Sequence, residues 1–168
     1  MITANINLGT NVSIDKEASI NNVSIGDNTK IASGVRIFGS PENQLTVGKS
    51  CYFGPNTIVE GFNAKVIIGE HVSFAQNVNL MTGSGPNASE KMQRVFPILK
   101  GAVSIGDHSW IGASAVIMPN VTLGICCIVA ANSFVNKSFP DYSIIGGTPA
   151  KLIRKMTDVE IEKLNTDD

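Results

Sequence analysis

The sequence predicts an all-β fold in which short strands wind into a stacked, three-sided coil. Three observations support this prediction. Aliphatic or aromatic anchor residues recur at every sixth position, a small or β-branched residue follows most anchors four positions later, and glycine or alanine often follows the anchor directly. A period of six does not fit an α-helix, because its anchors would scatter around the helix circumference. It also differs from the period of two along an ordinary strand.

The anchors form successive groups of three along most of the chain. They are Leu8, Ile14 and Ile20; Ile25, Ile31 and Ile37; Val47, Phe53 and Val59; Ile68, Phe74 and Leu80; Ile105, Ile111 and Ile117; and Leu123, Val129 and Val135. Gly, Asn and Asp between the anchors suit the positive φ angle that a tight corner often needs. Three edges would close one coil, and coils would stack at about the 4.8 Å spacing of neighbouring strands. A β-sandwich is the alternative, but its strands would be unusually short.

Two segments interrupt the period. Residues 39–46 contain GSPENQ, which is typical of a turn-rich bulge between coils. Residues 82–103 lose the period entirely, and we expect them to form a loop that projects from the coil. Insertions in repeat proteins often lie on the binding face, so this loop is predicted to be functional, with a passive insertion as the alternative.

The C-terminal segment departs from the repeat. We expect a β-helix domain over residues 1–136, with the loop insertion at 82–103, and a C-terminal unit over 137–168. That unit should contain a strand and turn followed by a short helix, in which Thr157 and Glu160 have the spacing of a capping box. Ile161 and Leu164 are predicted to face inward, so that the helix caps the open coil.

Composition and charge exclude several function classes. The net charge of −1 gives no basic field for nucleic acid. The first residues do not resemble a signal peptide, and no apolar run is long enough for membrane insertion, so we expect a cytoplasmic protein. Cys51, Cys126 and Cys127 lack the spacing of metal ligands, and we expect buried thiols and no metal site. Small molecules or other protein chains are the expected partners.

Three motifs carry a resemblance to a known family. They read FP at 96–97, IGDHSWIG at 105–112 and GTPAKLIR at 147–154. Together they resemble the hexapeptide-repeat acyltransferases, in particular the galactoside and maltose acetyltransferase branch. The resemblance implies a left-handed parallel β-helix, and the hand comes from it alone, because parallel crossovers are normally right-handed. It also implies a homotrimer that transfers an acetyl group from acetyl-CoA to a hydroxyl or amine.

The resemblance further implies that CoA lies in the groove between adjacent subunits. The positions that match CoA contacts of the family are Ala113, Ala131, Asn136, Lys137, Lys151 and Arg154. Cations with several donors suit the CoA phosphates. The alternative is a solvated basic end of the chain.

The general base of the family is missing. In the branch that the chain resembles, a histidine follows a Thr-Gly pair at the start of the loop, but here Ser84 or Gly85 stands at that place. Loss of a general base costs about 10²- to 10⁴-fold in rate. His71, His108 and Glu90 are the remaining candidates, each with a plain surface role as the alternative. A neutral amine is already nucleophilic, so the missing histidine favours an amino-sugar acceptor.

The acceptor site is predicted from polar and aromatic side chains near the loop. The candidates are Tyr52, Asn56, Asn79, Ser84 and Trp110. Asparagine is also a common corner residue, and the tryptophan could instead pack at a trimer contact. The leading hypothesis is an acetyltransferase that acts on a sugar or similar small acceptor. Alternatives are a catalytically silent CoA-binding or structural trimer, and a carbonic anhydrase of the same fold, whose histidine spacing is absent here.

Overall fold

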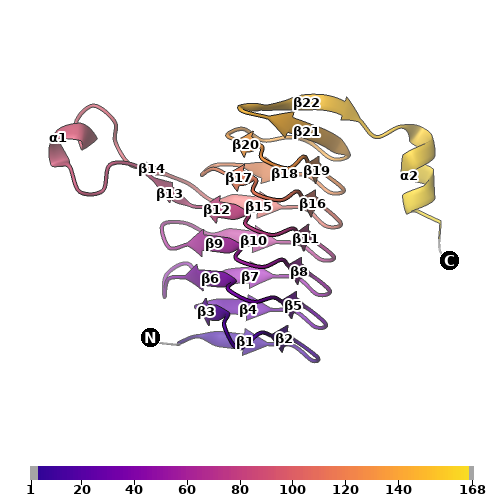
Figure 1. The fold of residues 1–168 in the computed structure, drawn as a ribbon, viewed down its shortest axis with the longest axis horizontal. Helices are drawn as coiled ribbons and strands as arrows, with labels where there is room; N and C mark the ends of the chain where they lie inside the picture. Colours follow the sequence, from indigo (N-terminus) through magenta and orange to yellow (C-terminus); the bar gives the residue numbers. More distant parts are fainter. Residues whose placement is uncertain (1–3, 167–168) are drawn as a thin grey trace.

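The computed structural model describes residues 4–166 and shows a three-sided parallel β-helix (Figure 1). Three parallel sheets form its faces. The first sheet contains β1 (Ile6–Leu8), β4 (Val23–Ile25), β7 (Leu45–Val47), β10 (Val66–Ile68), β15 (Val103–Ile105) and β18 (Thr122–Leu123). The second contains β2 (Ser13–Ile14), β5 (Lys30–Ile31), β8 (Tyr52–Phe53), β11 (Ser73–Phe74), β16 (Trp110–Ile111), β19 (Ile128–Val129), β21 (Ser143–Gly147) and β22 (Ala150–Lys155). The third contains β3 (Ser19–Asn21), β6 (Arg36–Gly39), β9 (Ile58–Gly61), β12 (Asn79–Met81), β17 (Val116–Ile117) and β20 (Phe134–Val135).

The predicted anchors form one column on each face. In the first sheet, pairing places Leu8 beside Ile25 and continues in register to Leu123. The inward side chains of successive coils therefore stack into one hydrophobic core, in which Phe53 and Phe74 are fully buried. Their rings stack with centroids 4.9 Å apart and an interplanar angle of 8°. The three cysteines are buried, as predicted, and burial raises the pKa of each thiol.

Tight turns join the faces at three corners. The first corner connects the first sheet to the second, the second corner connects the second sheet to the third, and the third corner connects the third sheet back to the first. At the first corner, one residue per coil has a positive φ angle between 53° and 60°. These residues are Asn11, Asn28, Ser50, His71, His108, Cys126 and Tyr142. The corner thus needs a residue that tolerates the left-handed region, and asparagine and histidine are enriched there.

The extra residues of the chain all emerge at the third corner. The bulge after β6 lies there, a short turn after β9 lies there, and the long loop leaves β12 at the same edge. The loop begins as an antiparallel ribbon of β13 (Gly83–Ser84) and β14 (Leu99–Lys100) and carries α1 (Glu90–Gln93) (Figure 1). It projects from the coil, as predicted.

Hydrogen bonds fix the base of this loop. The side chain of Thr82 is fully buried. Its backbone N–H donates to Glu60 Oε2 at 2.9 Å, and its hydroxyl donates to the same oxygen at 3.2 Å. The hydroxyl also accepts from the backbone N–H of Asn63 at 3.1 Å. The loop therefore leaves the coil from a rigid anchor shared with the neighbouring turn.

The C-terminal helix corrects one prediction. The capping box of α2 (Asp158–Leu164) is present, with Thr157 and Glu160 exchanging hydrogen bonds. However, the helix has no buried residues, Leu164 is 52% exposed, and α2 lies beside the coil (Figure 1). Parallel β21 and antiparallel β22 continue the second sheet instead. The expectation of a capping helix is wrong because these two strands already cover the last coil. Among residues 4–166, no helix is long and apolar enough to span a membrane.

Candidate functional site

The fold distributes the predicted site residues over all three corners. His71 and His108 lie at the first corner, in the turns after β10 and β15. Ala113 and Ala131 lie at the second corner, in the turns after β16 and β19. Glu90 lies on the loop of the third corner, which projects away from the other two (Figure 1). Within one chain, the three groups therefore do not form a single site.

The two histidines form a stacked pair. Their ring centroids are 4.8 Å apart, and the planes differ by 4°. Each backbone N–H bonds to the coil below, which fixes the positive φ turn, and both side chains are exposed. Carboxylates accompany them, since Asp107 Oδ1 accepts from the backbone N–H of Glu70 at 2.8 Å and Glu70 pairs with Lys49 at 3.2 Å. The pair occupies the same corner position as the positive-φ residues of the other coils.

The second corner and the outer face of the second sheet bring several predicted residues together. Asn132 N–H donates to the carbonyl of Ala113 at 2.8 Å, so the turns that carry Ala113 and Ala131 stack directly. On the neighbouring sheet face, Tyr52 and Trp110 point outward in one column, with Ser73 between them. Trp110 is 55% exposed and Tyr52 is 43% exposed. This face thus presents two aromatic surfaces beside the predicted CoA corner.

The two predicted asparagines lie in and directly after turns of the second corner. Asn56 occupies the turn after β8 with a φ angle of 59°. Asn79 lies on β12 of the third sheet, where its Nδ2 donates to the carbonyl of Asn77 at 3.4 Å. Asn56 is exposed, so its amide is open to solvent. Asn56 thus supplies the positive φ angle of its turn, while Asn79 bonds back to Asn77 in the turn before β12.

The third corner holds the remaining loop residues. Ser84 pairs with Leu99 in the ribbon, and Gly85 follows it. Glu90 lies in the first turn of α1 and is exposed. Asn136 and Lys137 also occupy this corner, two coils past the loop, and Lys137 Nζ lies 5.4 Å from the ring centroid of Phe139. The position that the resemblance assigns to a histidine therefore carries either Ser84, in a strand, or Gly85, directly after it.

Two cations on β22 differ in their surroundings. Arg154 forms a bidentate ion pair with Glu160, at 2.7 Å and 2.8 Å. Hydrogen bonds from Arg154, and then from the Thr157 backbone, lower the pKa of Glu160 to about 2. Lys151 is exposed and forms no ion pair within the described chain. A phosphate could bind Lys151 directly, whereas it would have to compete with Glu160 for Arg154.

This ion pair predicts a pH dependence for α2. The pKa of Glu160 is depressed in the folded state, so its contribution is present above the ordinary value of 4.5 and is lost as the pH falls towards about 2. Glu160→Gln should therefore speed amide exchange in α2 at pH 7, because the pairing and half of the capping box are removed. Exposed Glu162→Gln is the matched control.

Hydrogen exchange measured from pH 7 down to pH 3 checks this expectation. The difference between the wild type and Glu160→Gln should shrink as the pH drops below 4.5. A difference that stays constant over this range would show that the carboxylate does not hold the helix.

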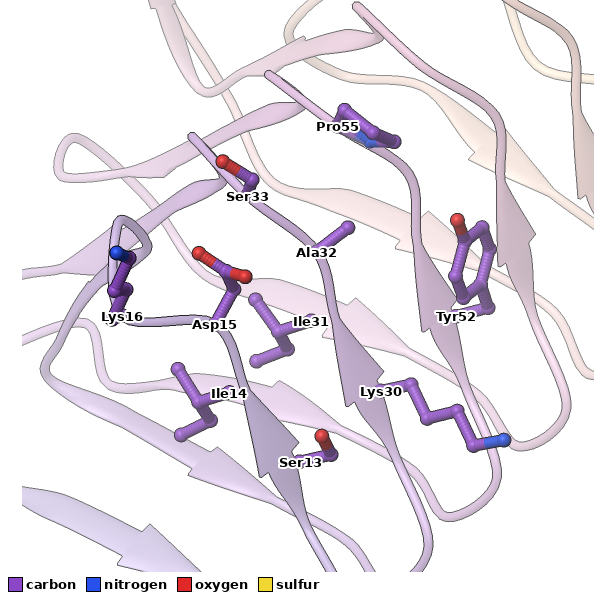
Figure 2. Close-up of a pocket in the computed structure, with 10 residues that line it drawn as sticks. All are labelled: Ser13, Ile14, Asp15, Lys16, Lys30, Ile31, Ala32, Ser33, Tyr52 and Pro55. Carbon is purple, nitrogen blue, oxygen red and sulfur yellow. The ribbon is translucent and has the colours of Figure 1, made fainter.

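A groove lies on the N-terminal part of the second sheet (Figure 2). Its volume is 650 Å³. We call it the N-terminal groove, and its lining residues are Ser13, Ile14, Asp15, Lys16, Lys30, Ile31, Ala32, Ser33, Tyr52 and Pro55. Sequence reasoning found Tyr52 but missed the two lysines. The sequence did contain a signal for Lys30. It directly precedes the anchor Ile31, and the residues that precede the other anchors of this face are uncharged.

Comparisons with known proteins agree with this architecture. The family described as bacterial transferase hexapeptide (six repeats) matches residues 102–137. The galactoside O-acetyltransferase of Escherichia coli is 30% identical over 135 residues, which cover 80% of this chain and 64% of that protein. A protein assigned as the colanic acid biosynthesis acetyltransferase WcaF of Escherichia coli is 31% identical over 136 residues, covering 81% and 71%.

A solved structure is similar over nearly the whole chain. It is a variant of AntD, an N-acyltransferase from Bacillus cereus, in complex with dTDP-4-amino-4,6-dideoxyglucose and coenzyme A. The TM-score is 0.79 at 25% identity, and the match covers 95% of this chain and 88% of that one. The chain spans 58% to 64% of the length of three of its curated relatives. The stacked hexapeptide coils, the motifs and these similarities together show that the chain belongs to the hexapeptide-repeat acyltransferases and has their left-handed parallel β-helix.

Proposed function

We propose that the protein transfers an acetyl group from acetyl-CoA to a sugar acceptor, and that the acceptor atom is an amine. The observation that carries this proposal is the similarity to AntD over 95% of the chain, because that enzyme is seen with an amino sugar nucleotide and coenzyme A. The absence of a histidine at position 84 or 85 supports an amine, since the usual histidine base is not in the loop. The relatives named as acetyltransferases support the acetyl group.

The reaction balances without a cofactor other than the thioester. The lone pair of the amine attacks the thioester carbonyl, the C–S bond breaks, and an amide and coenzyme A form. The ammonium proton of the intermediate goes to the departing thiolate, directly or through water. The chain has to orient the two substrates and stabilise the oxyanion.

The distribution over corners supports a site between subunits of a homotrimer. His108 lies at the first corner and Ala113 at the second, with the second sheet between them. The loop that carries Glu90 leaves from a different edge. A second copy can bring its third corner against the second corner of the first copy, which would bring the loop to the predicted CoA positions.

We also propose that the reaction takes place in the cytoplasm, because acetyl-CoA is made there.

An acceptor panel tests the proposal. Purified protein is incubated with acetyl-CoA and amino sugars, nucleotide-linked amino sugars and simple glycosides, and thiol release and product mass are followed. We expect acetylation of a nucleotide-linked amino sugar and much slower reaction with glycosides. Binding of CoA without turnover on every acceptor would support the alternative, a catalytically silent trimer.

Substitution of the candidate bases gives a second test. We expect His71→Asn, His108→Asn and Glu90→Gln each to keep kcat within tenfold of the wild type, because a neutral amine needs no side-chain base before attack. The pH profile should then follow the pKa of the acceptor amine. A loss of 10² or more for one variant would instead identify that residue as the base.

A further inference from the structure

We propose that the N-terminal groove binds a nucleoside diphosphate, which carries the sugar acceptor. The inference deepens the proposed function, on which it rests for the identity of the acceptor. The groove combines three kinds of group that such a ligand needs: a cation for phosphates, an apolar floor for a base, and a carboxylate for ribose hydroxyls. Figure 2 shows these groups around one open space.

The cations of the groove are available for a ligand. Within residues 4–166, Lys16 and Lys30 have no ion-pair partner, whereas Lys49 and Arg154 are each paired with a glutamate. Lys30 is exposed on β5, and register places it between Ser13 and Tyr52. The outward residues on the next four strands of this sheet are uncharged, so Lys30 is a lone positive charge on that stretch of the face.

The two sides of the groove differ in charge, which places the phosphates. Figure 2 shows Lys30 beside Tyr52, with Asp15, Lys16 and Ser33 across the groove. The carboxylate of Asp15 lies on the second side, and Ser33 there donates to Glu17 at 2.5 Å. On this side Lys16 stands beside the carboxylates of Asp15 and Glu17, which outnumber it, so this side attracts phosphates less than Lys30 does and can accept from ribose hydroxyls. The diphosphate therefore belongs at Lys30, and the nucleoside lies across the floor.

The floor between the two sides is apolar. Ala32 and the exposed Pro55 contribute to it, whereas the side chain of Ile31 belongs to the core (Figure 2). Ile14 remains partly exposed because the first coil has no described coil beneath it. A planar base can cover this surface, and the exposed ring of Tyr52 offers a face on which a base or sugar ring can stack.

The groove lies at a suitable distance from the predicted acyl donor. Tyr52, Ser73 and Trp110 occupy consecutive rungs of the second sheet. With about 4.8 Å between rungs, Trp110 lies about 10 Å from Tyr52 and about 14 Å from Lys30. A sugar attached to a diphosphate at Lys30 can extend past Tyr52 towards Trp110, which neighbours Ala113. The outward residues of the second sheet therefore run from the proposed nucleotide site at Lys30 to the second corner, where Ala113 lies.

Direct binding tests this inference without any reaction. Isothermal titration of the full chain with dTDP, UDP and GDP, each with and without CoA, measures the dissociation constants. We expect at least one nucleotide to bind, and Lys30→Gln to weaken it tenfold or more, since a charge-assisted hydrogen bond is lost. Exposed Lys65→Gln, which lies outside the groove, should change the affinity less than twofold.

Two further probes identify the parts of the ligand. Binding of the corresponding nucleoside should be insensitive to Lys30→Gln, because the nucleoside has no phosphate. Tyr52→Ala should weaken both ligands. Inorganic pyrophosphate that bound as tightly as the nucleotide would overturn the inference, since the groove would then be an anion site only. Equal effects of Lys30→Gln and Lys65→Gln, or no nucleotide binding, would also overturn it.

Failure of this inference differs from failure of the proposed function. Acetylation of a nucleotide-linked sugar with an unchanged KM in Lys30→Gln would keep the function and reject the groove. Nucleotide binding that depends on Lys30, combined with no turnover on any acceptor, would keep the groove and reject the reaction.

Discussion

Phe74→Ala is expected to lower the free energy of unfolding by about 3–5 kcal/mol, the range for removal of a buried phenylalanine. Phe74 is fully buried and stacks on Phe53 of the coil below, with centroids 4.9 Å apart. Each coil contacts only its neighbours, so the cavity would open between two coils and no other element could collapse into it. Urea denaturation followed by circular dichroism, at fixed protein concentration, measures the loss.

Phe62→Ala is the matched control for this prediction. Phe62 is 62% exposed at the third corner, where its backbone N–H donates to Glu60 and its carbonyl accepts from Asn43 Nδ2, and both bonds are kept in the variant. We expect a change within about 0.5 kcal/mol for this surface substitution. Similar losses for the two variants would show that the stacked anchors do not form the stabilising core.

Gly112→Ala should cost about 1–3 kcal/mol, as overpacking does, and should also weaken CoA binding. A Cβ atom at Gly112 would lie 2.6 Å from the backbone nitrogen of Ala131 and 2.6 Å from the carbonyl oxygen of Val129. Both are backbone atoms held by the parallel pairing of β16 with β19, so neither can move away cheaply. The turns that carry Ala113 and Ala131 would separate, and these are the predicted CoA contacts.

Gly61→Ala provides the comparison. The nearest atoms to its added Cβ are the ends of the Leu45 and Val66 side chains, both at 3.2 Å. Side-chain ends can adjust by a few tenths of an ångström, and this glycine is distant from the second corner. We expect a smaller loss of stability and an unchanged affinity for CoA. Titration with CoA and thermal unfolding of both variants check the order.

The fold could be predicted from the sequence because one physical rule repeats. Every anchor from Ile25 to Val135 has the same task, which is to fill the interior of a coil, so a single period fixes three columns at once. The capping box was predictable for a similar reason, since Thr157 and Glu160 interact locally. The position of α2 could not be predicted in this way, because it depends on whether β21 and β22 leave the end of the coil open.

The candidate site was harder to predict than the fold. Residues such as His108 and Glu90 are close in sequence numbering, yet they belong to different corners, and only the three-dimensional winding separates them. The N-terminal groove has no motif, because Asp15, Lys30 and Tyr52 come from three successive coils. Their proximity follows from the coil length, which the bulge after β6 changes, so register had to be seen in the structure.

The confinement of all insertions to the third corner has a consequence for how such a protein can diversify. At the first and second corners the spacing of six residues between anchors is fixed, since an added residue there would shift every following inward side chain of the coil. The remaining edge accepts segments of any length, as the turn after β9 and the ribbon of β13 and β14 show. Substrate preference can therefore change through longer or exchanged segments at the third corner, while the three sheets and the other two corners stay the same.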